Sequence, residues 1–290
     1  MEETFETPGA VQLYVENEVG LIAITASQTR STIVSLEPAT PGAEELIERA
    51  IVECRSIPNG HAVGVRVSRR NGMRYVRREA VIVRVEVPEE SVVKVMAGSA
   101  DVEIMGPVGS VDVSTASGDI STDDVAADVT AKSGSGDVTL GTVGGDLRVH
   151  TASGDLRCSS VAGTVLFATA SGDVEVGAAR NRVEVKGTSG SVRLGELSHG
   201  ARIMNVSGDV RVLSVDRGTV HVRSVSGDVS VGVARGVDLH VDVETMTGSV
   251  NSEIPLGDAP GPAHHDGRVD LSVRSVSGNV DIARALEQVA

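Results

Sequence analysis

The chain has 290 residues, of which 40% are hydrophobic but only 1% aromatic, so small aliphatic side chains must build its core. Its 26 basic and 40 acidic residues give a formal charge of −14, which opposes binding to nucleic acid or to an anionic lipid surface. No apolar run reaches the length of a transmembrane helix, so direct insertion into a membrane is not expected.

Residues 1–105 predict an irregular β region that caps a repeat array. Short runs of alternating apolar residues at 11–15, 21–24, 63–67 and 81–87 are typical of strands. Between them, a helix is expected at about 41–53, because Pro41 stands near its start and acidic residues follow in its first turn. A cap is needed because the open end of a β-repeat array exposes unpaired strand edges.

From residue 106 onward, the tripeptide Ser-Gly-Asp or a close variant recurs and predicts a series of turns. The glycines of this series are Gly118, Gly136, Gly154, Gly172, Gly190, Gly208 and Gly227. The first six are spaced 18 residues apart, and the later steps to Gly227, Gly248 and Gly278 are 19, 21 and 30 residues. A weaker turn signal halfway between them divides each unit into two arms of nine residues. Such a fixed period is the signature of a repeat architecture.

Within each arm, apolar and polar residues alternate, as in a strand with one buried face and one solvent-exposed face. The pattern fits a two-sided parallel β-solenoid, in which each coil adds one strand to each of two sheets, or a stack of antiparallel hairpins. The constant period favours the solenoid, because in-register stacking requires coils of equal length. We therefore predict an all-β fold, with Val212 and Val222 facing inward and Arg193 and Arg211 facing solvent.

Two further features follow near the C-terminus. Residues 253–268 contain three prolines and break the period, which predicts a loop insertion. Residues 282–290 predict a small capping helix. The expected organisation is thus an N-terminal region at 1–105 and regular repeats at 106–290, forming one continuous domain.

The tandem Ser-Gly-Asp-Val units, preceded by Val85-Glu86-Val87-Pro88, resemble the DUF4097 family of bacterial β-strand-repeat proteins. The resemblance covers most of the chain, best from about Val81 to Ile282. It implies a β-solenoid-like fold and little about function, because the word "adhesin" is attached to that family by analogy.

A column of aspartates is the strongest chemical signal in the repeats. Its members are Asp119, Asp137, Asp155, Asp173, Asp209 and Asp228. Calcium-binding β-rolls also use nine-residue arms, but their Gly-Gly-x-Gly-x-Asp loop is missing here. The interpretation that we favour is that Ser and Asp bond backbone amides at each turn.

The remaining reactive residue types do not form a catalytic set. Cys158 occupies a core position of the repeat, Cys54 stands alone, and His264-His265 has no third metal ligand. No nucleophile elbow, zinc motif, phosphate loop or dinucleotide fingerprint is present in the sequence. We expect no enzyme activity, no cofactor and no catalytic or metal residues.

These observations predict a non-enzymatic binding or scaffolding surface for a protein partner, with self-association through the solenoid ends as a further expectation. A surface adhesin-like module and a calcium-binding β-roll are the alternatives. The acidic N-terminus lacks the apolar region of a signal peptide, which predicts a cytoplasmic location, with surface display left open.

Overall fold

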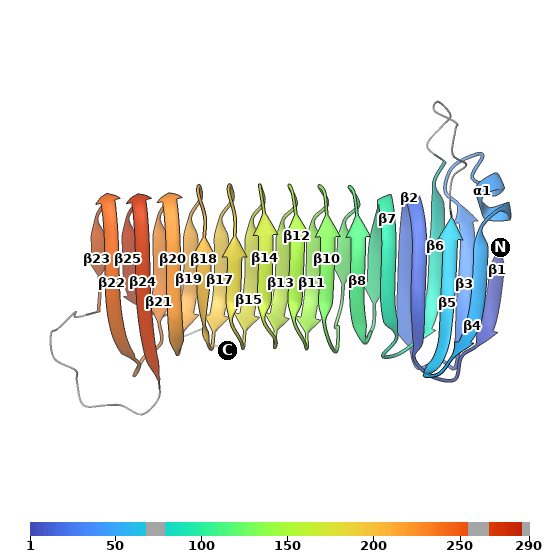
Figure 1. Ribbon diagram of the computed structural model, residues 1–290, viewed down its shortest axis with the longest axis horizontal. Coiled ribbons are helices and arrows are strands. Elements are labelled where there is room, and N and C mark those ends of the chain that lie inside the picture. Colours follow the sequence, from blue (N-terminus) through green and yellow to red (C-terminus); the bar gives the residue numbers. More distant parts are fainter. Residues whose placement is uncertain (68–78, 255–266, 286–290) are drawn as a thin grey trace. The chain divides into compact units, whose positions relative to one another are not determined.

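The computed structural model describes residues 1–67, 79–254 and 267–285, and its contacts divide the chain into two units, Met1–Gly145 and Asp146–Ala290. Both units are built almost entirely from strands (Figure 1). The predicted division of the chain after residue 105 stays a prediction.

Unit 1 contains eleven strands and one helix. They are β1 (Glu2–Glu6), β2 (Val11–Ser27), β3 (Ser31–Pro38), α1 (Glu44–Glu48), β4 (Ile51–Ile57), β5 (Gly60–Val67), β6 (Val81–Pro88), β7 (Val92–Met105), β8 (Ser110–Thr115), β9 (Ile120–Thr122), β10 (Val129–Ser133) and β11 (Val138–Val143).

Unit 2 contains fourteen strands. They are β12 (Leu147–Thr151), β13 (Leu156–Val161), β14 (Val165–Thr169), β15 (Val174–Ala179), β16 (Val183–Lys186), β17 (Val192–Leu197), β18 (Gly200–Met204), β19 (Val210–Val215), β20 (Gly218–Ser226), β21 (Val229–Val233), β22 (Asp238–Thr247), β23 (Val250–Ser252), β24 (Arg268–Ser277) and β25 (Val280–Arg284).

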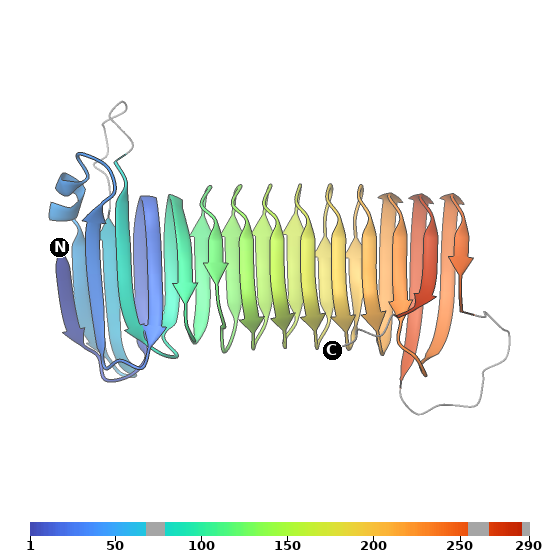
Figure 2. The same ribbon diagram turned by 180° about the vertical axis from the view of Figure 1, so that it is seen from behind.

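The repeat forms the predicted two-sided parallel solenoid in each unit. In unit 2, β13, β15, β17 and β19 pair in parallel on one side, and β14, β16, β18 and β20 do so on the other. From β13 to β19, residues lie beside those 18 positions later, as in the pair Val174 and Val192, and the step from β18 to β20 is 19 residues, as in the pair Ala201 and Val220. The views from the front and from behind show these two sets of strands (Figures 1 and 2). Stacked antiparallel hairpins are therefore excluded.

The interior contains the alternating aliphatic residues of both sheets. Val212 and Val222 are 1% and 0% exposed, whereas Arg193 and Arg211 stack on each other at outward positions, so the predicted register is confirmed. Phe167 is the one aromatic ring in the described core. Since the two sheets enclose a narrow space, small β-branched residues fill it without rings.

Strand order departs from chain order in both units. In unit 1, β2 lies between β7 on one side and β5 and β6 on the other. In unit 2, β24 and β25 pair with β20 and β21, while β22 and β23 pair with β24 and β25 from the opposite side. After β23 the chain returns, so that its last coil, β24 and β25, lies between the coil of β20 and β21 and the coil of β22 and β23. The 30-residue step from Gly248 to Gly278 reflects this return. The insertion predicted at 253–268 falls mainly on residues 255–266, outside the described residues.

Both helix predictions need correction. The helix expected at about 41–53 is the short α1, because its apolar side chains Leu46 and Ile47 are already buried and β4 begins at Ile51. At the C-terminus, Ile282 lies in strand β25, 1% exposed and paired with Val231, so the expected helix does not begin there. Residues 286–290 lie outside the described part of the chain.

Antiparallel strands close one end of the unit 1 solenoid. Strand β3 pairs antiparallel with β6, β4 does so with β5, and β1 adds to β3. Reversing direction at this end replaces the regular coil edge with short antiparallel strands, of which β1 is rich in Glu, and this gives less opportunity for continued stacking.

Candidate functional site

The predicted aspartate column exists within each unit, and its carboxylates bond the backbone. The Oδ1 atom of one aspartate accepts a hydrogen bond from the N–H one coil further on, over 2.7–3.0 Å. These acceptors are Asp101, Asp119, Asp155, Asp173, Asp209 and Asp228. Asp101 belongs to the same ladder although the tripeptide pattern did not indicate it. Each carboxylate therefore satisfies a turn amide, which is the structural role that we favoured from the sequence.

Within the described residues, the geometry of the column does not form a metal-binding cluster that would support the calcium hypothesis. Among residues 1–67, 79–254 and 267–285, no group of three or more His, Cys, Asp or Glu side chains is placed to hold a metal ion. Calcium binding by the column stays a prediction, and the predicted loop pair His264-His265 lies outside the described residues.

The glycines of the series are needed because the coils approach closely. A Cβ atom on Gly136 would overlap the carbonyl oxygen of Gly118, and one on Gly208 would overlap that of Gly190. The two turns differ in backbone conformation, because Gly208 has a φ of 122° whereas the φ of Gly136 is not positive. Close approach, rather than a left-handed conformation, is thus what Gly118, Gly136, Gly172, Gly190, Gly208 and Gly227 share.

A second group of residues, which the sequence did not single out, forms a recess on the outer face of unit 1. It measures about 320 Å³ and is lined by residues of β2, β4, β5 and β7. We call it the Tyr14 recess. Its lining residues are Gln12, Leu13, Tyr14, Glu53, Arg55, Ala62, Val63, Gly64, Arg66, Val92 and Lys94.

Strand pairing builds the recess from distant segments. Tyr14 of β2 lies beside Gly64 of β5 on one side and Lys94 of β7 on the other. Glu53 of β4 lies beyond Gly64, and Asp112 of β8 lies beyond Lys94. Because Gly64 has no side chain, the row is hollow beside the tyrosine ring.

Backbone conformation does not require glycine at position 64. Gly64 does not have a positive φ, and the nearest atoms to a Cβ placed there would be those of the Glu53 side chain, at 3.4 Å or more. This distance is an ordinary van der Waals contact. The hollow is therefore a property of the surface and not a requirement of the strand.

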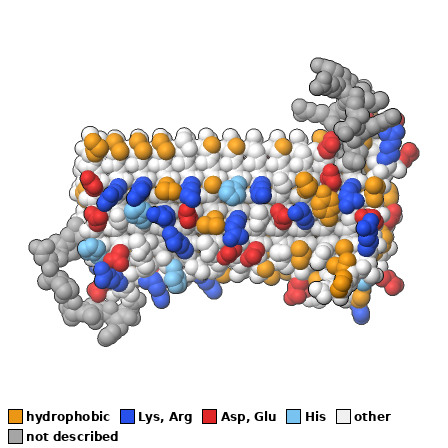
Figure 3. Space-filling model, viewed as in Figure 1, with side chains coloured by type: hydrophobic (Ala, Val, Ile, Leu, Met, Phe, Trp, Pro, Cys, Tyr) orange, Lys and Arg blue, Asp and Glu red, His pale blue; other side chains and the backbone are white. Residues whose placement is uncertain are grey.

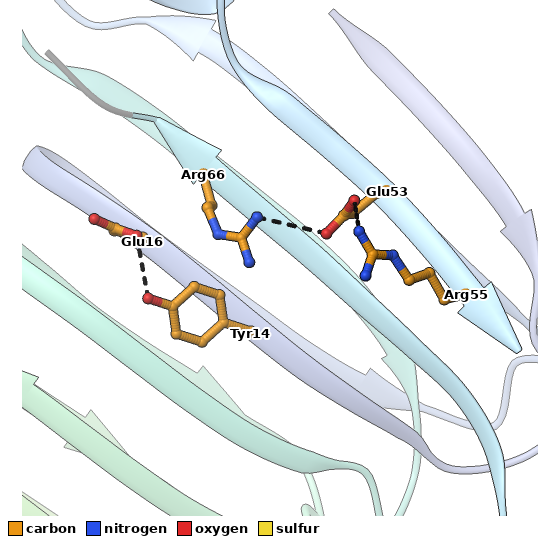
Figure 4. A network of polar contacts seen from close by, with 5 residues as sticks. All are labelled: Tyr14, Glu16, Glu53, Arg55 and Arg66. Carbon is orange, nitrogen blue, oxygen red and sulfur yellow. Dashed lines mark hydrogen bonds and ion pairs between the residues drawn. The ribbon is translucent and has the colours of Figure 1, made fainter. Parts of the chain in front are cut away.

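Glu16 and Arg66 lie beside the Tyr14 ring, and Glu53 and Arg55 lie beyond Arg66 (Figure 4). The Arg66 guanidinium lies 5.4 Å from the ring centroid, a cation–π distance, and its Nη1 is 3.5 Å from Glu53 Oε1. Arg55 donates to the other oxygen of Glu53 over 2.7 Å. One carboxylate thus serves two guanidinium groups.

The tyrosine hydroxyl and the lysine complete the rim. Tyr14 Oη donates to Glu16 Oε2 over 3.1 Å; partial burial, followed by this bond, raises the pKa of Tyr14, which keeps the phenol protonated. Lys94 Nζ donates to Asp112 Oδ2 over 2.9 Å, and this bond raises the pKa of Lys94. The recess therefore offers a ring, a hydroxyl and fixed cations, the groups that orient a polar ligand.

Neither cysteine is placed for nucleophilic chemistry. Burial raises the pKa of the Cys158 thiol to about 12, and it also raises that of Cys54. The buried Cys158 thiol thus stays protonated near neutral pH and behaves as a small apolar group, as predicted. No helix of the described residues is long and apolar enough to cross a membrane.

Sequence reasoning missed the recess because strands far apart in the chain form it. One signal was available: Tyr14 is one of two tyrosines, and it stands at the outward position between Leu13 and Val15. A large ring on the wet side of a strand, in a chain with 1% aromatic residues, marks a surface contact.

The described strands form a parallel β-solenoid, and a family model matches most of the chain. The model described as Toastrack DUF4097 matches residues 22–283, and the chain belongs to this family. No curated protein matches the chain.

Solved structures of low identity cover nearly the whole chain. A "putative cell adhesion protein" from Clostridium sporogenes is 12% identical, with 98% of this chain and 99% of that one covered and a TM-score of 0.33. A "putative adhesin" from Bacteroides fragilis is 13% identical, with 97% and 96% covered and a TM-score of 0.38. Another from Parabacteroides distasonis is 11% identical, with 97% and 96% covered and a TM-score of 0.36.

Proposed function

We propose that this chain is a non-enzymatic binding scaffold and that the Tyr14 recess contacts its protein partner. The observation that carries the proposal is the hollow at Gly64, which the backbone does not require and which a ring and three cationic side chains border. Surface recesses of this kind, apolar at one wall with few fixed polar groups, are typical binding sites.

The charge distribution supports a partner segment that carries a carboxylate. Arg55 and Arg66 share the single carboxylate of Glu53, so the rim there has one more cation than anion. A guanidinium already held in place by an ion pair loses less rotamer freedom when it binds a second carboxylate. An acidic peptide segment is therefore the ligand class that we propose.

The raised pKa values of both thiols support a role without covalent catalysis. The binding energy of a scaffold is spread over the ring, the cations and the surrounding strand surface. We therefore expect truncation of a single recess side chain to weaken binding and to leave folding intact.

An array of immobilised peptides that differ in net charge tests this proposal. We expect the full chain to bind acidic peptides, and we expect Gly64→Leu, which fills the hollow, to bind them at least about tenfold more weakly. Thr130→Leu, at an outward position of β10, is the matched control and should bind like the wild type. Equal binding by Gly64→Leu and the wild type would remove the recess from the proposal.

Adhesion at a cell surface is the second candidate function, since adhesion is named in the neighbours' descriptions and belongs there to those proteins. Protease treatment of intact producing cells, with immunodetection of this chain, separates the two candidates. Loss of the chain from intact cells supports adhesion. Protection, with recovery in the cytosolic fraction, supports an intracellular scaffold and the cytoplasmic location expected from the sequence.

A further inference from the structure

Four exposed hydrophobic side chains form a line along one edge of unit 2. Each stands immediately before a Ser-Gly or Thr-Gly turn: Val206, Val225, Val276 and Met246, which are 43%, 47%, 45% and 77% exposed. We call this line the valine ridge. Figure 3 shows hydrophobic side chains in a row over β18, β20, β24 and β22.

Strand register places the four residues on consecutive coils. Ser207 bridges to Ser226, which puts Val206 beside Val225. The pairs Ser224–Ser275 and Ser226–Ser277 place Val225 beside Val276. Thr245 and Thr247 pair with the same two serines, so Met246 lies beside Val276 on its other side. The spatial order is therefore Val206, Val225, Val276, Met246.

The solenoid itself does not require large apolar residues at this position. Earlier coils have small or polar residues there, namely Ala116, Gly134, Ala152, Ala170 and Thr188. Those coils stack with the same parallel register. Three valines and a methionine that face water in successive coils thus need an explanation outside folding, and contiguous exposed apolar side chains mark interaction surfaces.

We propose that the valine ridge is the contact through which two copies of this chain associate side by side. The spacing of the ridge selects this occupant. Its side chains repeat every coil, about 4.8 Å apart, so three steps span about 14 Å. Three turns of a helix span about 16 Å, and three same-face steps of a strand about 20 Å, so both fall out of step with the ridge. A second copy has the same repeat and stays in step along the whole ridge.

The charges beside the ridge select one orientation. Arg223 and Arg274 stand two residues before their ridge valines and Glu244 two before Met246, so this side has a net positive charge. Asp209 and Asp228 stand three residues after their ridge valines. A two-fold axis parallel to the ridge brings the arginine side of each copy toward the aspartate side of the other. A perpendicular two-fold axis brings arginine toward arginine, which repulsion disfavours. The parallel arrangement therefore places Val225 of one copy opposite Val225 of the other.

The ridge is narrow compared with stable interfaces, which bury about 800 Å² on each partner. Each copy also has a net charge of −14, so long-range repulsion opposes association. We therefore expect a reversible dimer that forms with rising concentration. Raising the salt concentration screens the long-range repulsion and should not dissociate it.

Sedimentation velocity of the full chain over a concentration series tests the proposal. The double variant Val225→Ala/Val276→Ala has the residue that earlier coils place at this position, and we expect its dissociation constant to rise about tenfold or more. Leu213→Ala is the matched control, since Leu213 is 42% exposed on β19 and outside the ridge. A wild-type chain that stays monomeric at every concentration would overturn the proposal, as would a double variant that dimerises like the wild type.

Disulfide trapping tests the orientation. In a Cys54→Ser background, Val225→Cys should form covalent dimers under mild oxidation, while Cys158 stays buried and unreactive. Crosslinking that requires Val225→Cys and Val276→Cys chains together would instead show the perpendicular axis and overturn the proposed orientation.

Discussion

Early and late coils of the repeat have the same inward residues but differ on the outside. Inward positions from β8 to β21 hold mostly Val, Leu or Ile, with Ala131, Cys158, Phe167 and Ala201 among the exceptions, and most of these side chains are at most 5% exposed. At the position before the turn, by contrast, Ala152 and Ala170 give way to Val206 and Val225. The comparison teaches that the repeat constrains the interior, where every coil fills the same space, and leaves the exterior free to acquire a contact surface.

The largest effect should come from breaking what all coils share. Val212→Asp places an uncompensated charge at a position that is 1% exposed, and we expect a loss of about 3–5 kcal/mol in the free energy of unfolding. Urea denaturation followed by circular dichroism measures it. Arg211→Ala, the adjacent outward position, should change stability by less than about 0.5 kcal/mol. Normal stability of Val212→Asp would contradict the inward register.

Turn glycines give the next largest effect and distinguish early from late coils. Gly136→Ala should cost about 1–3 kcal/mol, because the new Cβ overlaps the Gly118 carbonyl. Gly208→Ala should cost about 1 kcal/mol more, since its φ of 122° adds backbone strain to a similar overlap. Urea midpoints measure both. Gly64→Ala is the control with ordinary contacts, and a loss there as large as at Gly136 would contradict close approach as the cause.

Each carboxylate of the aspartate column should contribute less to the free energy of unfolding than a turn glycine does. Asp173→Ala removes the acceptor of the Ser191 N–H, a 2.7 Å bond, and we expect a loss of about 0.5–2 kcal/mol. Asp173→Asn keeps an acceptor oxygen and should lose less. Thermal unfolding in calcium and in EDTA tests the alternative role of the column. A melting temperature that rises with calcium in the wild type and not in Asp155→Asn/Asp173→Asn would support calcium binding over a purely structural ladder.

The smallest expected effect is that of His221 on the pH dependence of stability. His221 lies on β20, four residues before Val225 of the valine ridge. Burial lowers its pKa, and the nearby Arg223, Arg202 and Arg274 lower it further. The unfolded chain therefore binds the proton more readily, so this contribution to stability is complete above the unfolded pKa of about 6.5 and is lost as the pH falls below it. Melting temperatures between about pH 7 and pH 5 should fall slightly less for His221→Gln than for the wild type. An identical pH dependence would contradict this role.

The period and the alternation predicted the solenoid because both are local properties of the chain. An 18-residue spacing requires equal coils, and alternate valines require one buried face. The order of the outer coils could not be predicted in this way. Strands β22 and β24 both fit the pattern of the repeat, and which one pairs with β20 depends on where the chain returns after β23.

The two candidate sites, the aspartate column and the Tyr14 recess, differ in the same way. The aspartate column follows from a tripeptide that recurs every 18 or 19 residues, so the sequence by itself determined the column, while the structure shows its carboxylates accepting hydrogen bonds from backbone amides. The Tyr14 recess joins β2, β4, β5 and β7, and only the tertiary structure decided that Gly64 leaves a hollow beside Tyr14. The physical reason is that a repeat fixes its own neighbours through its period, whereas contacts between unlike strands depend on the path by which the chain brings them together.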